Sequence, residues 1–329
     1  MKQTEKETVL VTGGSGYVGS YCILQLLRAG YNVKTTIRSM HKKGELLKKI
    51  RAAGAVNTEN LTFFEADLND DRGWADAVKN CVYVLHVASP FPASTPKDEN
   101  ELIIPARDGA LRVLKAARNA GVKRVVLTSS FAAIGYSIDK TNHIFTETDW
   151  TDPLAPIAPY IRSKTVAELA AWDFVRSEGG DLELSVINPV GIFGPVLGHS
   201  YSASIELVKG IMKGDIKENS LFTFGVVDVR DVADIHITAM KHPGAAGERF
   251  LATSDGAMSF YDIAQIIKKQ RSEIAVSVAE MIRTSPDLYV NLSNEKAGKV
   301  LNWFPRTKEE AILASVDSIS ELEKSKSTN

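Results

Sequence analysis

The stretch from Thr8 to Gly19 limits the possible folds of this chain more than any other part of the sequence. A short β-branched run ends there in glycines, Thr-Gly-Gly-Ser-Gly-Tyr-Val-Gly, and a helical pattern from Val18 to Ala29 follows directly. We expect a buried strand, a tight turn and a helix whose first backbone N–H groups have no intrahelical partner. Such a helix start carries partial positive charge and suits a pyrophosphate. Gly13, Gly16 and Gly19 would supply, respectively, a positive φ, a close approach to the ligand and close packing of helix on strand.

Two rival motifs that also contain a glycine-rich turn do not match the letters of this one. A P-loop needs Gly-Lys-Ser/Thr, but Gly19 is followed by Ser20 and Tyr21. A nucleophile elbow needs a glycine two residues after Ser15, and Tyr17 stands there. An ordinary connection between a strand and a helix remains as the alternative, and the order of strand, turn and helix favours nucleotide binding over it.

Composition and charge exclude several classes of protein. The chain has 329 residues, 44% of them hydrophobic and 24% charged, with a net charge of −1, so no global field draws it to nucleic acid or an anionic membrane. The polar N-terminus is unlike a signal peptide, and no apolar run could span a bilayer. Cys22 and Cys81 lack CxxC spacing, and the six histidines form neither HExxH nor a Cys/His cluster. We expect buried thiols, no metal and a cytoplasmic protein.

Strand and helix patterns alternate as far as Pro189, which predicts a doubly wound parallel sheet of the α/β class. The rhythm changes beyond Pro189, where helical patterns dominate. The expected strands are 32–37, 61–65, 81–87, 124–129, 183–188 and 249–252. The expected helices are 42–51, 71–79, 99–120, 160–177, 204–213, 229–240 and 259–269. Ser259 is expected to cap the last of these helices, and the segment from 291 onward is expected to be mostly helical.

Arg38 is a departure from the usual dinucleotide-binding pattern. Sheets that bind NAD place Asp or Glu at the end of the second strand, where it holds the ribose 2′-OH. Here that strand ends in Arg38, and Lys42 and Lys43 begin the next helix. An arginine fork suits a 2′-phosphate, so this position favours NADP over NAD, although such cations can also form a solvated helix face.

Tyr160 and Lys164 are four residues apart, which places them on one face of a helix. A lysine ammonium beside a phenol favours the phenolate, so this tyrosine could exchange a proton with a substrate oxygen. A second match to the spacing, Tyr136 with Lys140, lies in a turn-rich polar stretch, whereas Tyr160 opens an apolar-periodic segment. Context therefore selects Tyr160.

Ser129 and Ser130 follow the strand 124–128, at the same sheet edge as the glycine turn. A hydroxyl at that edge can donate a hydrogen bond to a substrate carbonyl. The alternative is a serine that caps a turn. Together with Tyr160 and the glycine turn, the pair favours catalysis.

These motifs occur in the order typical of a known family, and the sequence resembles the extended short-chain dehydrogenases/reductases from Thr8 to about Trp303. Within that family it is similar to the plant dihydroflavonol reductases and, more so, to the group of yeast methylglyoxal (aldehyde) reductases. The matching letters are Thr12-Gly-Gly-Ser-Gly-Tyr-Val-Gly19, Asp67-Leu68, His86-Val-Ala-Ser-Pro-Phe91, Thr128-Ser-Ser130, Tyr160-x-x-x-Lys164 and Asn188-Pro-Val190.

The resemblance implies a role for each matching residue. Ser130 would bind and polarise a carbonyl, Tyr160 would be the acid, and Lys164 would bind the nicotinamide ribose. It also implies a Rossmann domain of residues 1–188 plus about 223–253, and a smaller, mainly helical substrate lobe of about 189–222 plus 254–329. The residues expected to bind NADP(H) are Gly13, Ser15, Gly16, Tyr17, Val18, Arg38, Lys42, Asp67, Leu68, Ala88, Ser89, Thr128, Tyr160, Lys164, Pro189 and Val190.

Departures from the family pattern narrow the range of expected substrates. Sugar-nucleotide dehydratases carry Asp-Glu where this chain has Phe131-Ala132, and plant flavonoid reductases carry Asn where it has Gly135. Phe91 and Phe131 match aromatic positions of the aldehyde/ketone reductases and are expected to line the substrate pocket with Ser130, core packing being the alternative.

The sequence therefore predicts an NADPH-dependent reductase of a small-molecule aldehyde or ketone, either monomer or homodimer, with no nucleic-acid or membrane partner. The alternatives are a sugar-nucleotide epimerase that retains NAD and a non-catalytic protein that senses NADP.

Overall fold

The computed structural model describes residues 6–90, 97–218 and 222–327. It divides into two compact units. Unit 1 is Met1–Ile138, Glu147–Asn188 and Ala233–Phe250, and unit 2 is Asp139–Thr146, Pro189–Val232 and Leu251–Asn329. The ranges expected from the sequence differ from these units mainly at 139–146 and 223–232, which fall in unit 2.

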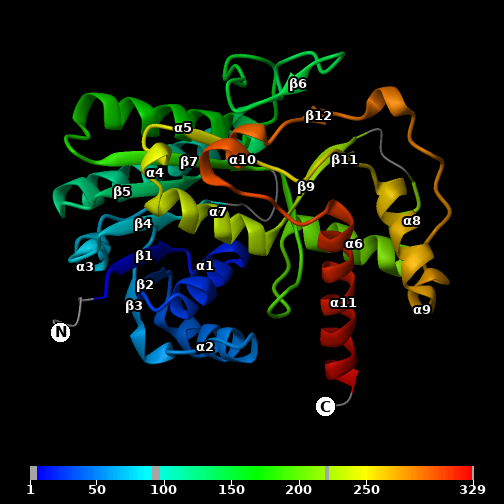
Figure 1. Cartoon of the computed structure of the whole chain (residues 1–329), viewed down its shortest axis with the longest axis horizontal. Helices are drawn as coiled ribbons and strands as arrows, with labels where there is room; N and C mark the ends of the chain where they lie inside the picture. The colour runs from blue at the N-terminus through cyan, green and yellow to red at the C-terminus, as the bar shows by residue number, and fades with distance from the viewer. Residues whose placement is uncertain (1–5, 91–96, 219–221, 328–329) are drawn as a thin grey trace. The chain divides into compact units, whose positions relative to one another are not determined.

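A seven-stranded sheet in the order β10-β7-β5-β4-β1-β2-β3 organises unit 1 (Figure 1). All neighbours from β7 to β3 are parallel, and the order reverses between β1 and β4. This confirms the predicted doubly wound parallel sheet, whose ligand site lies at the carboxyl edge beside such a reversal. The strands are β1 (Thr8–Thr12), β2 (Asn32–Ile37), β3 (Leu61–Glu65), β4 (Tyr83–His86), β5 (Arg124–Thr128), β7 (Glu183–Pro189) and β10 (Arg249–Ala252).

Helices follow the strands as the alternating pattern predicts. One core cluster joins Leu10, Val84 and Val125 of the sheet to Val113 of α4 and Phe174 of α5. The helices are α1 (Tyr17–Arg28), α2 (Lys43–Ala52), α3 (Trp74–Val78), α4 (Asn100–Asn119), α5 (Pro159–Glu178) and α7 (Val229–Lys241). The helix expected over 71–79 is shorter, because Gly73 takes a left-handed φ of 84° and delays its start to Trp74.

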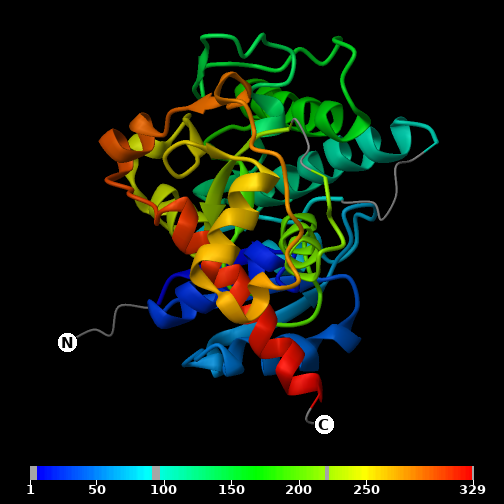
Figure 2. The same ribbon diagram turned by 90° about the vertical axis from the view of Figure 1, so that its right-hand side faces the viewer.

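Unit 2 contains most of the helices after β7 together with two small sheets. Its elements are β6 (Ile144–Phe145), β8 (Gly191–Phe193), α6 (Ala203–Lys213), β9 (Phe224–Asp228), β11 (Ala257–Met258), α8 (Phe260–Gln270), α9 (Ser272–Ala275), β12 (Asn291–Leu292), α10 (Glu295–Leu301) and α11 (Lys308–Ser327). Strands β11, β9 and β8 form one sheet, and β12 pairs with β6. Figure 2 shows α11 as a long helix leading to the C-terminus. The predicted cap Ser259 is confirmed: its side chain and that of Asp262 form a reciprocal capping box at α8.

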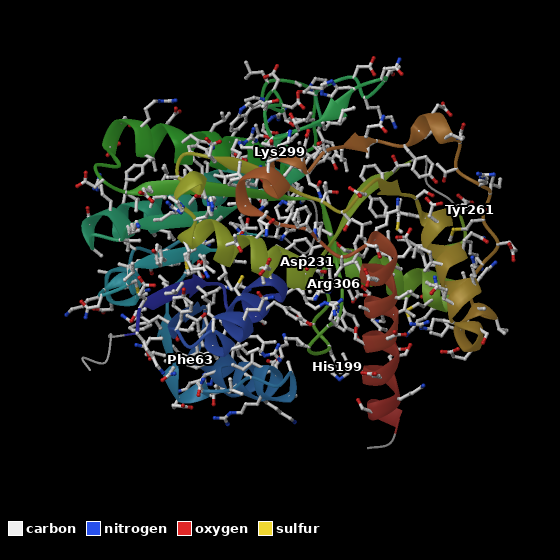
Figure 3. The ribbon with its side chains drawn as sticks, viewed as in Figure 1. Phe63, His199, Asp231, Tyr261, Lys299 and Arg306 are labelled. Atoms are coloured by element: carbon white, nitrogen blue, oxygen red, sulfur yellow. The ribbon has the colours of Figure 1, made fainter. Side chains whose placement is uncertain are left out.

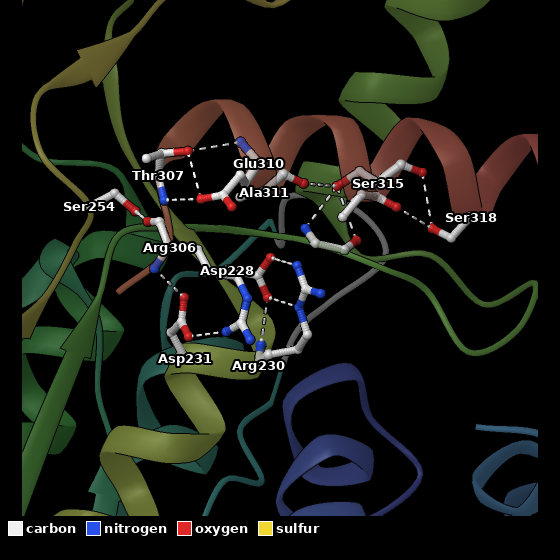
Figure 4. A network of polar contacts seen from close by, with 12 residues as sticks. Asp228, Arg230, Asp231, Ser254, Arg306, Thr307, Glu310, Ala311, Ser315 and Ser318 are labelled. Carbon is white, nitrogen blue, oxygen red and sulfur yellow. Dashed lines mark hydrogen bonds and ion pairs between the residues drawn. The ribbon is translucent and has the colours of Figure 1, made fainter. Parts of the chain in front are cut away.

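Ion pairs and serine hydroxyls connect α11 and the segment before it to the rest of unit 2 (Figure 4). Arg306 pairs with Asp231, and Figure 3 shows these two side chains next to one another. Gly194 N–H donates to Ser315 Oγ at 2.8 Å, and Ser315 Oγ donates to Gly194 O at 3.0 Å. The Asp228 carboxylate, fully buried, accepts two hydrogen bonds from the Arg230 guanidinium at 2.8 and 2.7 Å. The two Gly194–Ser315 hydrogen bonds hold the turn after β8 against α11.

Candidate active site

The glycine turn after β1 has the geometry expected of a phosphate cradle. Gly13 has a φ of 68°, and a Cβ on Gly19 would lie 2.5 Å from Gly13 O, so helix and turn are in close contact. The twelve-residue α1 begins at Tyr17. Its N-cap is Gly16, which has no side chain to cap the helix, and its first turn contains no acidic residue. Ser15 and Val18 flank this helix start. The turn therefore fits the pyrophosphate of a dinucleotide.

A buried link between two strand ends supports this turn. Thr12 and His86 are paired in register, and Thr12 Oγ1 lies 2.9 Å from His86 Nδ1. The same hydroxyl accepts a hydrogen bond from Ala88 N–H at 3.0 Å, so its own proton is directed at Nδ1. Burial, and then the charge of Lys164, lowers the pKa of His86 to about 3. A neutral imidazole thus holds the turn beside Ala88.

Arg38 lies at the carboxyl end of β2, as predicted, and both its side chain and that of Lys42 are exposed. Within the described ranges neither side chain makes a hydrogen bond or ion pair. Lys43 instead lies over the ring of Phe63 on β3, 5.4 Å from its centroid. The two unengaged cations fit a 2′-phosphate.

The other unit 1 residues expected at the cofactor lie at or just beyond the carboxyl ends of strands β3, β4 and β5. Asp67 Oδ1 accepts from Asn69 N–H at 2.9 Å, and Leu68 packs on α4 at Gly109, where a Cβ would approach Leu68 Cβ to 2.9 Å. Ala88 lies close to Gly13, because a Cβ added to Gly13 would be 3.0 Å from Ala88 Cβ. Thr128 Oγ1 lies 2.6 Å from His236 Nε2. Pro189 and Val190 belong to unit 2, and Phe91 lies outside the described residues.

Ser130 lies two residues beyond the end of β5 and is half-buried. Its Oγ accepts a hydrogen bond from Ala132 N–H at 3.1 Å, and its carbonyl oxygen accepts one from Asn188 Nδ2 at 3.2 Å. Thr165 of α5 donates to Ala132 O at 3.4 Å, which connects the serine loop to the helix.

Tyr160 and Lys164 occupy the first turns of α5, which begins at Pro159. Both are half-buried, and Lys164 Nζ lies 5.9 Å from the centroid of the Tyr160 ring. Lys164 Nζ also donates to Ser89 Oγ at 2.9 Å. The predicted helical context of Tyr160 is confirmed, and Tyr136 lies in irregular structure as expected.

A small pocket of about 20 Å³ lies beside Lys164, with Ser89, Thr128, Ser129 and Glu168 in its lining. Glu168 was not predicted as a site residue. Its spacing could have indicated it, because Glu168 lies one turn beyond Lys164 on the same helix face. Phe131 is half-buried and packs edge-on against Tyr136, with ring centroids 5.8 Å apart. Among the described residues no cluster of His, Cys, Asp and Glu could hold a metal, and no helix is long and apolar enough to cross a bilayer.

Comparison with known proteins adds independent information. A family model described as "NAD dependent epimerase/dehydratase family" matches residues 9–252. A Candida albicans protein with the provisional name NADPH-dependent methylglyoxal reductase is 34% identical over 321 residues, which cover 90% of this chain and 93% of that protein. The dihydroflavonol 4-reductase of Zea mays is 31% identical over 281 residues, 83% of this chain and 77% of that enzyme.

Among solved structures, the yeast methylglyoxal/isovaleraldehyde reductase Gre2 complexed with NADPH is similar with a TM-score of 0.85 and 26% identity, over 96% of this chain and 99% of that one. These relatives match the extended family that the motifs indicated.

Proposed function

Because the chain belongs to the NAD-dependent epimerase/dehydratase family, within the extended short-chain dehydrogenases/reductases, we propose that it reduces an aldehyde or ketone to the alcohol with NADPH. The observation that carries this proposal is the placement of Ser130, Tyr160 and Lys164 with the glycine turn in unit 1. The named relatives, which include reductases of methylglyoxal and of dihydroflavonol, support carbonyl reduction over other reactions of the family.

The residues at the sheet edge fit the parts of NADPH. The start of α1 would receive the pyrophosphate, Arg38 and Lys42 the 2′-phosphate, and Asp67 and Leu68 would flank the adenine. Lys164 would donate hydrogen bonds to the nicotinamide ribose, as it does to Ser89 Oγ here. Ala88, Ser89, Thr128, Pro189 and Val190 are proposed to line the rest of the dinucleotide. When bound, NADPH supplies the hydride that the carbonyl carbon accepts.

The protein's own groups would act on the carbonyl oxygen. Tyr160 donates its proton to that oxygen as negative charge develops, and Ser130 Oγ–H donates a hydrogen bond to it. The ammonium of Lys164, 5.9 Å from the centre of the Tyr160 ring, stabilises the phenolate left behind. Phe131, beside Tyr136, is proposed as an apolar wall of the substrate pocket.

The experiment that tests the function follows NADPH absorbance with a panel of aldehydes and ketones for the wild type, Tyr160→Phe and Tyr136→Phe. We expect Tyr160→Phe to lower kcat by about 100- to 10,000-fold, the range of a lost general acid, while the Kd for NADPH stays unchanged. Tyr136→Phe is the matched control, because Tyr136 shares the spacing to a lysine but not the helix. Substantial turnover by Tyr160→Phe would refute the mechanism.

The same measurements separate the alternatives. An epimerase would release tightly bound NAD on denaturation and consume no NADPH, and a non-catalytic sensor would bind NADPH with no turnover on any substrate. We also propose a cytoplasmic location, because Cys22 and Cys81 are buried free thiols rather than a disulfide.

A further inference from the structure

We propose that Glu168 is a positioning residue of the active site, which fixes the Ser130 loop against the helix that carries Tyr160 and Lys164. This inference rests on the proposed reductase function, because it assigns Glu168 an effect that acts through Ser130. The observation behind it is a carboxylate with no exposed side-chain surface that lies between the two parts of the candidate site.

Four donors converge on this carboxylate, three of them from segments outside α5 and one, Trp172, from the next turn of α5 itself. Ser129 Oγ–H and Asn188 Nδ2–H donate to Oε2 at 2.5 and 2.7 Å. Arg249 Nε–H and Trp172 Nε1–H donate to Oε1 at 2.6 and 3.2 Å. A buried charge is tolerated when it is paired and its lone pairs are satisfied, and here both conditions hold.

Two of these donors connect the carboxylate to the chain at Ser129 and at the Ser130 carbonyl. Ser129 is the preceding residue, and Asn188 uses its second N–H to donate to Ser130 O at 3.2 Å. Asn188 Oδ1 is buried with no hydrogen-bond partner among the described residues. Turning the amide around would aim Oδ1 at two acceptors, the Glu168 carboxylate and Ser130 O, so the carboxylate sets the orientation of Asn188.

Arg249 extends the same link to the far side of the loop. Its guanidinium donates to Glu147 O at 2.7 Å, to Asp149 O at 2.9 Å and to Ala133 O at 3.4 Å, and it stacks on the Trp150 ring, 3.5 Å from the centroid. The loop is therefore held at Ser129, Ser130 and Ala133 by groups that depend on Glu168.

Helix geometry connects this carboxylate to the chemistry. Tyr160, Lys164 and Glu168 are spaced by four residues on α5, so all three lie along one face. A displacement of the Ser130 loop relative to this face changes the distance between the hydroxyl and the oxygen that Tyr160 protonates. Misplacements of about 1 Å cost on the order of 100-fold in rate.

The test is a double-mutant cycle of Glu168→Gln and Ser130→Ala, with kcat measured per NADPH-binding site. Glutamine keeps the shape but replaces one acceptor oxygen by a donor and leaves Arg249 without its counter-charge. We expect Glu168→Gln to lower kcat by about 10- to 100-fold with little change in the Kd for NADPH. In the Ser130→Ala background the same substitution should lower kcat by less than about 3-fold, because the group through which it acts is absent.

Glu183→Gln is the matched control, because Glu183 pairs with the buried Arg124 at 2.6 Å at the opposite end of strands β5 and β7. It should lower the melting temperature without lowering kcat. If Glu168→Gln does not yield folded protein, Ser129→Ala replaces it in the cycle, because it removes one donor and leaves the Arg249 pair intact.

Each result has one meaning. Equal fold-losses in both backgrounds, or an unchanged kcat, would overturn the positioning role. A wild type without NADPH-dependent turnover, or a Ser130→Ala variant with full turnover, would instead overturn the proposed function.

Discussion

His86 gives the sharpest prediction about the dependence of stability on pH. Its side chain is buried at the end of β4, Thr12 Oγ1 lies 2.9 Å from Nδ1, and burial together with the charge of Lys164 lowers its pKa from 6.5 to about 3. Between pH 6.5 and 3 the unfolded chain therefore binds a proton at this histidine that the folded chain does not. The free energy of unfolding rises with pH in that window, so His86 costs stability as the pH falls below 6.5.

The size of the effect follows from the shift. Each pH unit well below 6.5 lowers the free energy of unfolding by about 1.4 kcal/mol through His86, which amounts to on the order of 3 kcal/mol at pH 4.5. In His86→Gln the residue no longer titrates, so this contribution disappears. The stability advantage of the wild type over the variant should therefore shrink by that amount between pH 7.5 and pH 4.5.

The assay is urea unfolding followed by tryptophan fluorescence at several pH values for both proteins. Cys22→Ala is a useful control, because burial raises the pKa of the Cys22 thiol to about 12 and no titration in this window is lost with it. Its difference from the wild type should not vary with pH. If the difference between the wild type and His86→Gln is also constant from pH 7.5 to 4.5, the argument from burial is refuted.

Two further predictions concern the cofactor and unit 2. The wild type should show a higher kcat/KM with NADPH than with NADH. Arg38→Ala should reduce this preference by about 10-fold or more, which is the effect of a lost charge-assisted hydrogen bond. A wild type that prefers NADH would contradict the role given to Arg38. Gly194→Ala should destabilise the protein by about 2–3 kcal/mol, because Gly194 has a φ of 110° and a Cβ would lie 2.9 Å from Asp228 Oδ1. Gly247→Ala, with a φ of 76° and open space around it, is the control in thermal unfolding, and equal losses would contradict the steric part of the argument.

Local sequence patterns predicted the strands of the seven-stranded sheet and the helices that pack against it. The expected strand 61–65 coincides with β3, and the expected helix 160–177 differs from α5 by one residue at each end. These segments have enough residues to show a period and clear terminal signals such as Pro159. The two-residue strands β6, β11 and β12 have no period, and only their pairing partners in the folded chain identify them.

The polar links beneath the site could not be predicted in the same way. Thr12 and His86 are 74 residues apart, and Glu168 and Arg249 are 81 residues apart. The first pair joins the ends of two neighbouring strands, and the second joins helix α5 to the start of strand β10. Both form only when the chain has folded, and no local spacing encodes that proximity. The glycine turn, Arg38 and the Tyr160–Lys164 pair were accessible from sequence because each is a local motif with its own physical reason.

The two Tyr-x-x-x-Lys matches show what a longer stretch of sequence adds. Eight residues after Tyr160, the same helix face carries Glu168, which is buried and accepts four hydrogen bonds. Eight residues after Tyr136 stands Ile144, which is exposed. A helix face whose first two polar residues are half-buried and whose third is a fully buried carboxylate needs donors from other segments. Three of the four donors to Glu168 come from outside α5, and Ser129 is one of them. If the proposed function holds, the third residue distinguishes the tyrosine of the site from one that only shares its spacing to a lysine.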